Sequence, residues 1–297
     1  MTSELATALA HQRDQLLDLM RALGSVAVAL SGGVDSAVVA QAAFLSLGEK
    51  ALAVTAHSPS VAERDRRDAA RVARQIGIRH VIVETAEFDL PAYRANGGDR
   101  CYHCKSELYQ RLEALRPSWG VAYLVSGANV DDLGDYRPGL LAAAEHGVRH
   151  PLQEVGLGKD QVRQLARHWG LEVADKPASP CLSSRIAPGV AATPERTRRI
   201  ELAEEFLRRH GLRDCRVRLH EGELARIEVP TETLAAVAEP GFRAALLAHF
   251  EELGFRFITL DLAGLRSGSL NTLIDLDVKR RFALETLHAA ADAAARA

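Results

Sequence analysis

Apolar residues in the first part of the chain come in short runs, separated by longer stretches of mixed polarity. A short apolar run suits a strand that is buried on both faces of a sheet. The runs predicted to be strands cover residues 25–30, 50–56, 80–84 and 121–127. The stretches predicted to be helices cover residues 3–23, 35–47, 61–76 and 159–169. This alternation predicts an α/β fold with a parallel sheet and helices on both of its sides.

The pattern changes after a stretch that is rich in proline. Residues 170–192 contain Pro177, Pro180 and Pro188 without clear periodicity, which predicts an active-site loop running into a linker. Thr193 and Pro194 then have the character of an N-cap and a first helical residue, for a helix to about residue 210. Further on, we predict strands over 215–220, 225–229 and 255–260 and a helix over 231–253. We therefore expect an α/β domain over residues 1–190 and a smaller α+β domain over 191–297.

Length and composition allow both domains to form a packed core. The chain has 297 residues, 47% of them hydrophobic and 26% charged, and its formal net charge is −2. A charge so close to neutral gives no overall attraction to nucleic acid, so we expect no nucleic-acid partner. The first residues lack the apolar core of a signal peptide, and no apolar run reaches the roughly 18 residues needed to span a bilayer. We expect a cytoplasmic location and no membrane contact.

A glycine-containing loop follows the first predicted strand. Residues 31–36 read Ser-Gly-Gly-Val-Asp-Ser, and the two glycines allow backbone N–H groups to approach phosphate oxygens closely. The loop contains no lysine, so it is not the Gly-x-x-x-x-Gly-Lys-Ser/Thr loop of enzymes that transfer a γ-phosphate. It resembles the PP-loop of ATP pyrophosphatases, which transfer AMP to a substrate. The ATP-binding residues predicted here are Ser31, Gly32, Gly33, Asp35 and Ser36.

The cations that the leaving pyrophosphate requires must come from elsewhere in the chain. Lys159 and Arg163 are four residues apart on one face of a predicted helix, and Lys176 and Arg185 flank Cys181. All four are candidates. Mg²⁺ is expected beside the phosphates, because it neutralises their charge.

A second polar segment, residues 126–132 (SGANVDD), follows the fourth predicted strand. The carboxyl ends of the strands are where parallel sheets bind ligands. Gly127 would permit close approach to ATP. Asp131 or Asp132 would hold Mg²⁺ or orient Arg137.

Three of the four cysteines form a possible ligand set. Cys101 and Cys104 make one Cys-x-x-Cys pair, and Cys181 lies 77 positions later. Structural zinc would call for a second pair, which is absent. Three thiolates can hold a 4Fe–4S cluster in which one iron has no protein ligand and can bind an extra sulfur atom. Cys215, on a predicted strand, is interpreted as a small buried residue.

Taken together, four segments resemble the LarE family. They are residues 31–36, residues 126–132 with 135–139 (DYRPG), residues 176–185 (KPASPCLSSR) and residues 266–271 (RSGSLN), within a similarity over about residues 20–275. LarE proteins are ATP-dependent sulfur transferases that help to make the nickel-pincer nucleotide cofactor of lactate racemase. The resemblance implies a PP-loop ATP pyrophosphatase domain over residues 1–190, a substrate and oligomerisation domain over 191–297, and hexamers.

The chemistry that the resemblance implies begins with pyridinium-3,5-biscarboxylic acid mononucleotide, one of whose carboxylates is adenylated with release of pyrophosphate. A sulfur nucleophile then displaces AMP. In one branch of the family the sulfur comes from a cysteine that becomes dehydroalanine, and the matching residue here is Cys181. Another branch has three cysteines and a 4Fe–4S cluster. Cys101, Cys104 and Cys181 resemble that second pattern, which we favour.

The residues themselves agree with this chemistry. The thiolate or sulfide needs a nearby cation, so Cys181, Arg185 and Lys176 are the predicted catalytic set. Arg185 is equally suited to bind the acidic substrate. Arg216 and Arg218 alternate on one strand face, which His220 continues, and are predicted to clamp a phosphate or carboxylate of the substrate. The acidic residues that would complete this pocket are Glu221, Glu223 and Glu228.

Two other enzyme classes share the loop. A tRNA thiolation enzyme would also adenylate and use three cysteines, but it requires a basic RNA-binding surface, and the arginines of residues 193–218 are offset by acidic residues. A synthetase that adds ammonia to an adenylate has no need of the three cysteines. A nucleotide sensor without enzymatic activity would release no pyrophosphate.

Overall fold

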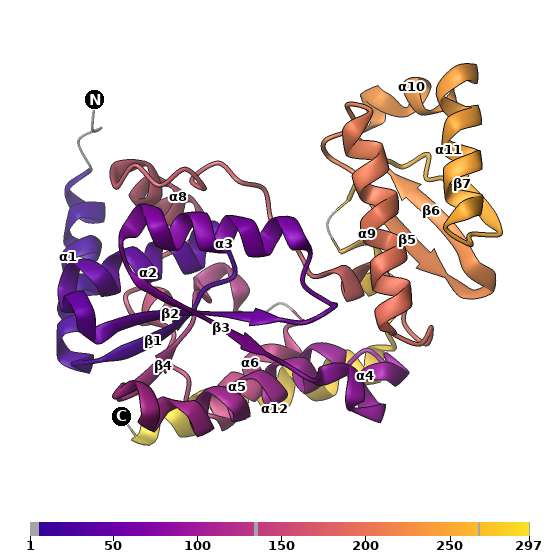
Figure 1. Cartoon of the computed structure of the whole chain (residues 1–297). Coiled ribbons are helices and arrows are strands. Elements are labelled where there is room, and N and C mark those ends of the chain that lie inside the picture. The colour runs from indigo at the N-terminus through magenta and orange to yellow at the C-terminus, as the bar shows by residue number, and fades with distance from the viewer. Residues whose placement is uncertain (1–5, 134–135, 267, 297) are drawn as a thin grey trace. The chain divides into compact units, whose positions relative to one another are not determined.

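The computed structural model describes residues 6–133, 136–266 and 268–296, and the chain forms two compact units (Figure 1). Unit 1 consists of Met1–Glu87, Cys101–Ser179 and Lys279–Ala297, and unit 2 of Phe88–Arg100 and Pro180–Val278. This division differs from the predicted single boundary after residue 190, and it places Cys181 in unit 2. Asp135 and Ser267, which belong to the family segments, lie outside the described residues, as do residues 3–5 of the first predicted helix.

Long-range contacts explain why this division differs from the predicted one. The side-chain amide of Asn96 donates to the carbonyls of Ala187 and Val190, each at 2.9 Å, and this ties residues 88–100 to unit 2. The ring of Phe282 packs on Tyr102, with ring centroids 5.9 Å apart, and this ties the C-terminal helix to unit 1. Contacts between residues so far apart in the sequence leave no local signal.

Unit 1 is built on a parallel sheet of four strands, as predicted. The strands are β1 (Val26–Ala29), β2 (Ala51–His57), β3 (Arg79–Glu84) and β4 (Tyr123–Val125). Their order is β3-β2-β1-β4, and Val26 of β1 is paired with Ala51 of β2 and with Tyr123 of β4. After β1 the chain adds β2 and β3 on one side of β1, and then β4 on its other side. The carboxyl ends of β1 and β4 therefore form the switch point where such sheets bind ligands.

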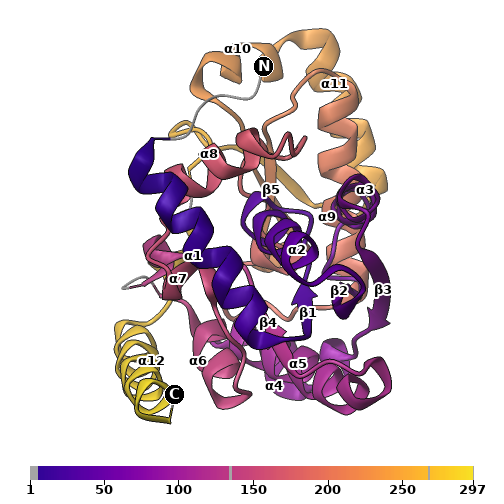
Figure 2. The ribbon, with the colours of Figure 1, turned by 90° about the vertical axis from the view of Figure 1, so that its left-hand side faces the viewer.

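Helices cover both faces of this sheet, which explains its uninterrupted apolar strands (Figure 2). One face packs against α1 (Thr7–Leu23), α2 (Val34–Leu47), α3 (Glu63–Ile76) and α8 (Lys159–His168). The other face packs against α5 (Arg100–Trp119) and α6 (Pro138–Glu145). The shorter α7 (Pro151–Glu154) and the C-terminal α12 (Leu276–Arg296) complete the helices that contribute to this unit.

Unit 2 has a three-stranded sheet. Strand β5 (Arg216–His220) is antiparallel to β6 (Leu224–Glu228), which is parallel to β7 (Phe257–Leu260). Its helices are α4 (Pro91–Ala95), α9 (Pro194–Arg209), α10 (Leu234–Ala238) and α11 (Pro240–Glu252). The predicted cap of α9 is present, since Thr193 Oγ1 accepts a hydrogen bond from Arg196 N at 3.3 Å. The single helix predicted over 231–253 was wrong: Pro240, which lacks an N–H group, begins a new helix instead.

The described helices contain none with both the length and the apolar character that a membrane span requires.

Candidate active site

The glycines of the loop after β1 are required by close packing. Gly32 has φ +75°, and a Cβ atom there would lie 2.9 Å from the backbone oxygen of Asp65 and 2.8 Å from the nitrogen of Ala69, both on α3. Gly33 is the N-cap of α2. A side chain at Gly32 would therefore push α3 away from the loop and from the N-terminus of α2.

The two serines of the loop fix its conformation by hydrogen bonds within the turn. Ser36 Oγ donates to the carbonyl of Gly33 at 3.1 Å and accepts from Ser31 N at 3.2 Å. The hydroxyls of Ser31 and Ser36 are themselves 3.2 Å apart. The structure thus brings the predicted ATP-binding residues of this loop into one small turn at the N-terminus of α2.

The segment after β4 lies directly against this turn. A Cβ atom at Gly127 would lie 2.6 Å from Ser36 N, so only glycine fits. Asn129 Nδ2 donates to Asp35 Oδ1 at 3.2 Å, and Asn129 is almost fully buried. Sequence reasoning did not single out Asn129, although it lies inside the segment that was predicted to bind ATP. Asp132 pairs with Arg137 at 2.8 Å, as one of the two predicted roles for this carboxylate requires.

Two lysines reach the loop, one from α8 and one from the irregular segment that follows it. Lys159, the first residue of α8, forms an ion pair with Asp35, and its backbone nitrogen donates to Asp131 Oδ2 at 2.7 Å. Lys176 Nζ lies 3.1 Å from the carbonyl oxygen of Gly32. The predicted Arg163 is used differently, because its guanidinium donates to the backbone carbonyls of residues 174 and 176. Lys159 and Lys176 thus both lie beside the loop, and Arg163 holds the backbone that carries Lys176.

Two carboxylates of α3 that sequence reasoning missed hold Lys176 in place. Its Nζ lies 3.0 Å from Asp65 Oδ1 and 2.7 Å from Asp68 Oδ2. Both aspartates lie in a highly charged helix. The sequence alone does not tell which of its acidic residues pair with a distant lysine and which are solvated.

A buried histidine adjoins the end of β4. His150 Nδ1 lies 2.8 Å from Ser126 Oγ. Burial lowers the pKa of His150 to about 4, and the opposing attraction of Glu154 and Asp132 is weaker. The imidazole is therefore neutral at neutral pH and fixes Ser126 beside Gly127.

The cysteines are distributed over both units. Cys101 and Cys104 lie near the start of α5, and the helical spacing of three residues puts them on one face. Cys181 is half-buried in unit 2, and Cys215 is buried, as predicted. The four cysteines form no disulfide. Within the described ranges, no group of three or more histidine, cysteine or carboxylate side chains lies close enough together to hold a metal ion.

Arg185 is fully buried and engaged by protein groups. Its guanidinium donates to Glu204 at 3.0 Å and to the carbonyl of Cys181 at 2.7 Å. Burial by itself would raise the pKa of the Glu204 carboxyl, but Arg185, with Arg216 and Arg208 nearby, lowers it below its usual range. Arg185 thus fixes the turn that carries Cys181, and this geometry favours a positioning role over the predicted contact with sulfur or substrate.

We expect Glu204→Gln to lower the free energy of unfolding by about 3 kcal/mol at neutral pH, because it leaves Arg185 buried without its counter-ion. Since the pKa of Glu204 is lowered in the folded state, its contribution is present above the ordinary carboxyl pKa and disappears as pH falls through the folded value. Urea unfolding at several pH values would measure both effects. The matched control is Glu205→Gln, which removes an exposed pair with Arg209 and should cost less than about 1 kcal/mol. Equal losses in the two variants would contradict this assignment.

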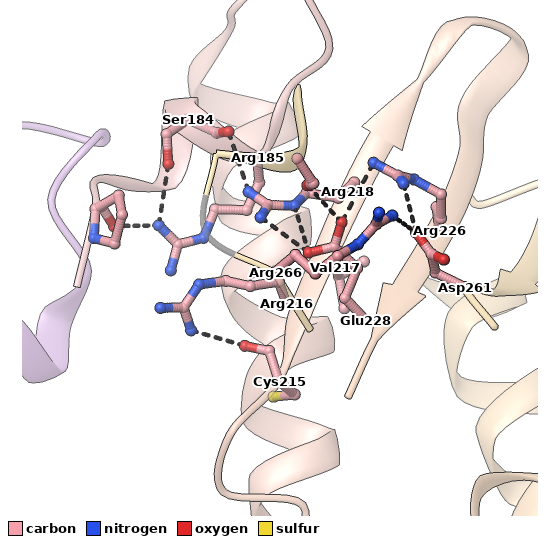
Figure 3. A network of polar contacts seen from close by, with 12 residues as sticks. Ser184, Arg185, Cys215, Arg216, Val217, Arg218, Arg226, Glu228, Asp261 and Arg266 are labelled. Atoms are coloured by element: carbon pink, nitrogen blue, oxygen red, sulfur yellow. Dashed lines mark hydrogen bonds and ion pairs between the residues drawn. The ribbon is translucent and has the colours of Figure 1, made fainter. Parts of the chain in front are cut away.

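Two residues of the predicted substrate site, Arg218 and Glu223, are already paired with other charged side chains of the protein. Arg218 donates through Nε and Nη2 to Glu228 Oε2, at 3.0 and 2.9 Å (Figure 3). Arg216 is half-buried, and its Nη1 donates to the carbonyl of Cys215 at 2.8 Å. Glu223 is paired with two arginines of α9, Arg196 and Arg199.

Unit 2 also contains a cavity of about 480 Å³, the size of a small-ligand site. It lies between the loop that follows the Cys181 turn and the tip of the β5–β6 hairpin. Burial, and the nearby Arg226, lower the pKa of the lining residue His220, so this imidazole is neutral at neutral pH. The lining residues are 187–191, Arg196, His220, Glu221, Gly222 and Leu273.

Comparisons with known proteins agree with the geometry of the nucleotide loop. Residues 13–96 match the asparagine synthase family. An uncharacterized protein of Synechocystis is 44% identical over 91% of this chain and 99% of its own length. The pyridinium-3,5-bisthiocarboxylic acid mononucleotide synthase of Lactiplantibacillus plantarum is 34% identical over 89% of this chain and 95% of its own length. A tRNA-specific 2-thiouridylase of Xanthobacter autotrophicus is 33% identical, but over only 52% of this chain and 49% of its own length.

Proposed function

Because the chain belongs to the LarE family of pyridinium-3,5-bisthiocarboxylic acid mononucleotide synthases, we propose that it is an ATP-dependent sulfur transferase of nickel-pincer nucleotide biosynthesis. It adenylates a carboxylate of pyridinium-3,5-biscarboxylic acid mononucleotide and then replaces AMP with sulfur. The similarity extends over nearly the full length of both chains, whereas the tRNA-modifying relatives match only about half. This difference favours the mononucleotide over tRNA as the substrate.

The observation that carries the proposal is the turn at residues 31–36 with Lys159 and Lys176 beside it. In the first step, a carboxylate oxygen attacks the α-phosphorus of ATP, and the bond to the bridging oxygen of pyrophosphate breaks. The two ammonium groups stabilise the charge that develops on the leaving pyrophosphate. Lys159 is held by Asp35, and Lys176 by Asp65 and Asp68, so both ammonium groups are in place before ATP arrives.

The second step needs a sulfur nucleophile, because a carboxylate becomes a good electrophile only as its adenylate. Sulfur attacks the acyl carbon, and the bond to the oxygen of AMP breaks. Cys101 and Cys104 share one helical face, and this arrangement supports the proposal that they hold a 4Fe–4S cluster together with Cys181. Such a cluster would supply a sulfide nucleophile. Arg185 holds the carbonyl of Cys181 and so orients the thiol for its role.

Three further parts of the proposal concern ligands and assembly. Asp132 is the carboxylate proposed for Mg²⁺, since it lies beside the loop at the ligand-binding edge of the sheet. Arg216 and Arg218 are proposed to contact the acidic substrate, and Arg216 is the better placed because it is only half-buried. A hexamer is proposed from the family resemblance.

The proposal is tested by incubating the protein with ATP, Mg²⁺, sulfide and the biscarboxylate mononucleotide. Pyrophosphate and AMP should form in equal amounts and only when the mononucleotide is present. The thiocarboxylate product should appear with them. Formation of ADP, or pyrophosphate release stimulated by tRNA instead of the mononucleotide, would contradict the assignment.

A further inference from the structure

The side chain of Asp65 contacts two residues, Lys176 and Ser179, that shortly precede Cys181 in the sequence. Its side chain is almost fully buried on α3, where Oδ1 accepts from Lys176 Nζ at 3.0 Å and Oδ2 accepts from Ser179 Oγ at 2.9 Å. Lys176 and Ser179 precede Cys181 by five and two residues. One carboxylate therefore holds both the lysine beside the nucleotide loop and the chain that continues toward the proposed sulfur site.

The same stretch of α3 forms the wall of the nucleotide loop. The backbone oxygen of Asp65 would lie 2.9 Å from a Cβ atom at Gly32, so α3 touches the loop without a gap. The adjacent Arg64 also contacts Ser179, because its Nη2 donates to Ser179 Oγ at 3.2 Å. We call the hydrogen bonds from Asp65 and Arg64 to the Ser179 hydroxyl the anchor. Its Nε is buried, and within the described residues it has no hydrogen-bond partner. Ser179 is thus held from two sides by consecutive residues of a helix that contacts the loop.

Ser179 is also the last residue of unit 1 before the chain enters unit 2. The contacts of Ser179 therefore fix the last residue of unit 1 to α3. Without the anchor, the residues before Cys181 would gain conformational freedom, and an ordered arrangement of the reacting groups would cost more entropy.

We propose that Asp65, acting through Ser179, is a positioning residue for the sulfur-transfer half of the reaction. It fixes the exit of the chain toward Cys181 to the wall of the nucleotide loop. Through Lys176, the same carboxylate also holds a cation for the adenylation half. The proposal rests on the function proposed above and adds the residue that links its two steps.

The variants Ser179→Ala and Asp68→Asn separate the two roles of Asp65. Both products are followed within a single turnover, while the adenylate is still being consumed. Ser179→Ala removes the anchor and leaves every contact of Lys176 in place, so the rate of pyrophosphate release in that turnover should stay near the wild-type value. Thiocarboxylate formation should fall about tenfold, the usual effect of losing one charge-assisted hydrogen bond. Asp68→Asn weakens the hold on Lys176, together with an exposed pair to Arg71, and leaves Ser179 untouched, so it should lower both products in proportion. Asp65→Asn should lower pyrophosphate release and also raise the ratio of pyrophosphate to thiocarboxylate.

Controls make the result specific to the anchor. Ser179→Thr keeps the hydroxyl and should restore the wild-type ratio. Ser118→Ala, at an exposed serine near the end of α5, should change nothing. A wild-type ratio of products in Ser179→Ala would overturn the proposal.

Hydrogen exchange of the unliganded protein tests the anchor without any activity. Amides of residues 176–182 should exchange about tenfold faster in Ser179→Ala than in the wild type, because one charge-assisted bond has been lost. Unchanged exchange would overturn the proposal. A wild-type protein that releases no pyrophosphate, yet shows this exchange difference, would contradict the proposed function alone.

Discussion

Replacing Lys159 or Lys176 by methionine is expected to reduce pyrophosphate release at least about a hundredfold. Each lysine supplies positive charge beside the turn proposed to receive the phosphates, and removal of one such group from a preorganised site typically costs that much in rate. Methionine preserves most of the side-chain volume, so the fold should remain intact. A coupled pyrophosphate assay with the biscarboxylate mononucleotide is the measurement, and circular dichroism checks the fold.

The matched control is Lys50→Met, which removes an exposed lysine that precedes β2. It should retain wild-type activity. If a folded Lys159→Met or Lys176→Met protein releases pyrophosphate at the rate of this control, the corresponding lysine has no part in the first step.

Replacement of Cys101, Cys104 or Cys181 by alanine is expected to abolish repeated sulfur transfer with added sulfide. Anaerobically reconstituted wild-type protein should bind about four irons per chain, and each variant should lose the iron or the activity. Pyrophosphate release should survive, because no cysteine contributes to the nucleotide turn. Cys215→Ala should keep both the iron and the turnover, since Cys215 is a buried residue of the unit 2 core.

Intact-protein mass spectrometry after turnover distinguishes the two sulfur sources. A sacrificed cysteine leaves a residue about 34 Da lighter, because its C–S bond is broken. If a 4Fe–4S cluster carries the sulfur, the protein mass should stay unchanged and each chain should turn over many times. A loss of that mass at Cys181, with full activity in Cys101→Ala, would establish Cys181 itself as the sulfur source.

The fold of unit 1 could be predicted because its signals are local. Strands β1 and β2 are buried on both faces and read as continuous apolar runs, while Gly24 and Gly48 follow the ends of α1 and α2. The loop at residues 31–36 was recognisable for the same reason, since a turn that cradles phosphate needs glycine at fixed positions.

The remaining parts of the site depend on contacts between residues far apart in the sequence. Asp65 and Asp68 acquire a role only when Lys176, more than a hundred residues later, folds back onto α3. Arg185 has the sequence context of a catalytic cation, but Glu204 neutralises it in the interior. Charge and spacing identify a possible ligand. They do not tell whether that side chain already forms an ion pair inside the protein, as Arg185 does with Glu204.

The transfer of oxygen from substrate to AMP tests the central claim most directly. The biscarboxylate mononucleotide is labelled with ¹⁸O in its carboxylates and incubated with the protein, ATP, Mg²⁺ and sulfide, and the AMP is analysed by mass spectrometry. If a carboxylate attacks the α-phosphorus and sulfur then displaces AMP, each AMP retains one labelled oxygen and is about 2 Da heavier. AMP without the label, formed while the thiocarboxylate accumulates, would contradict the adenylation of the substrate carboxylate.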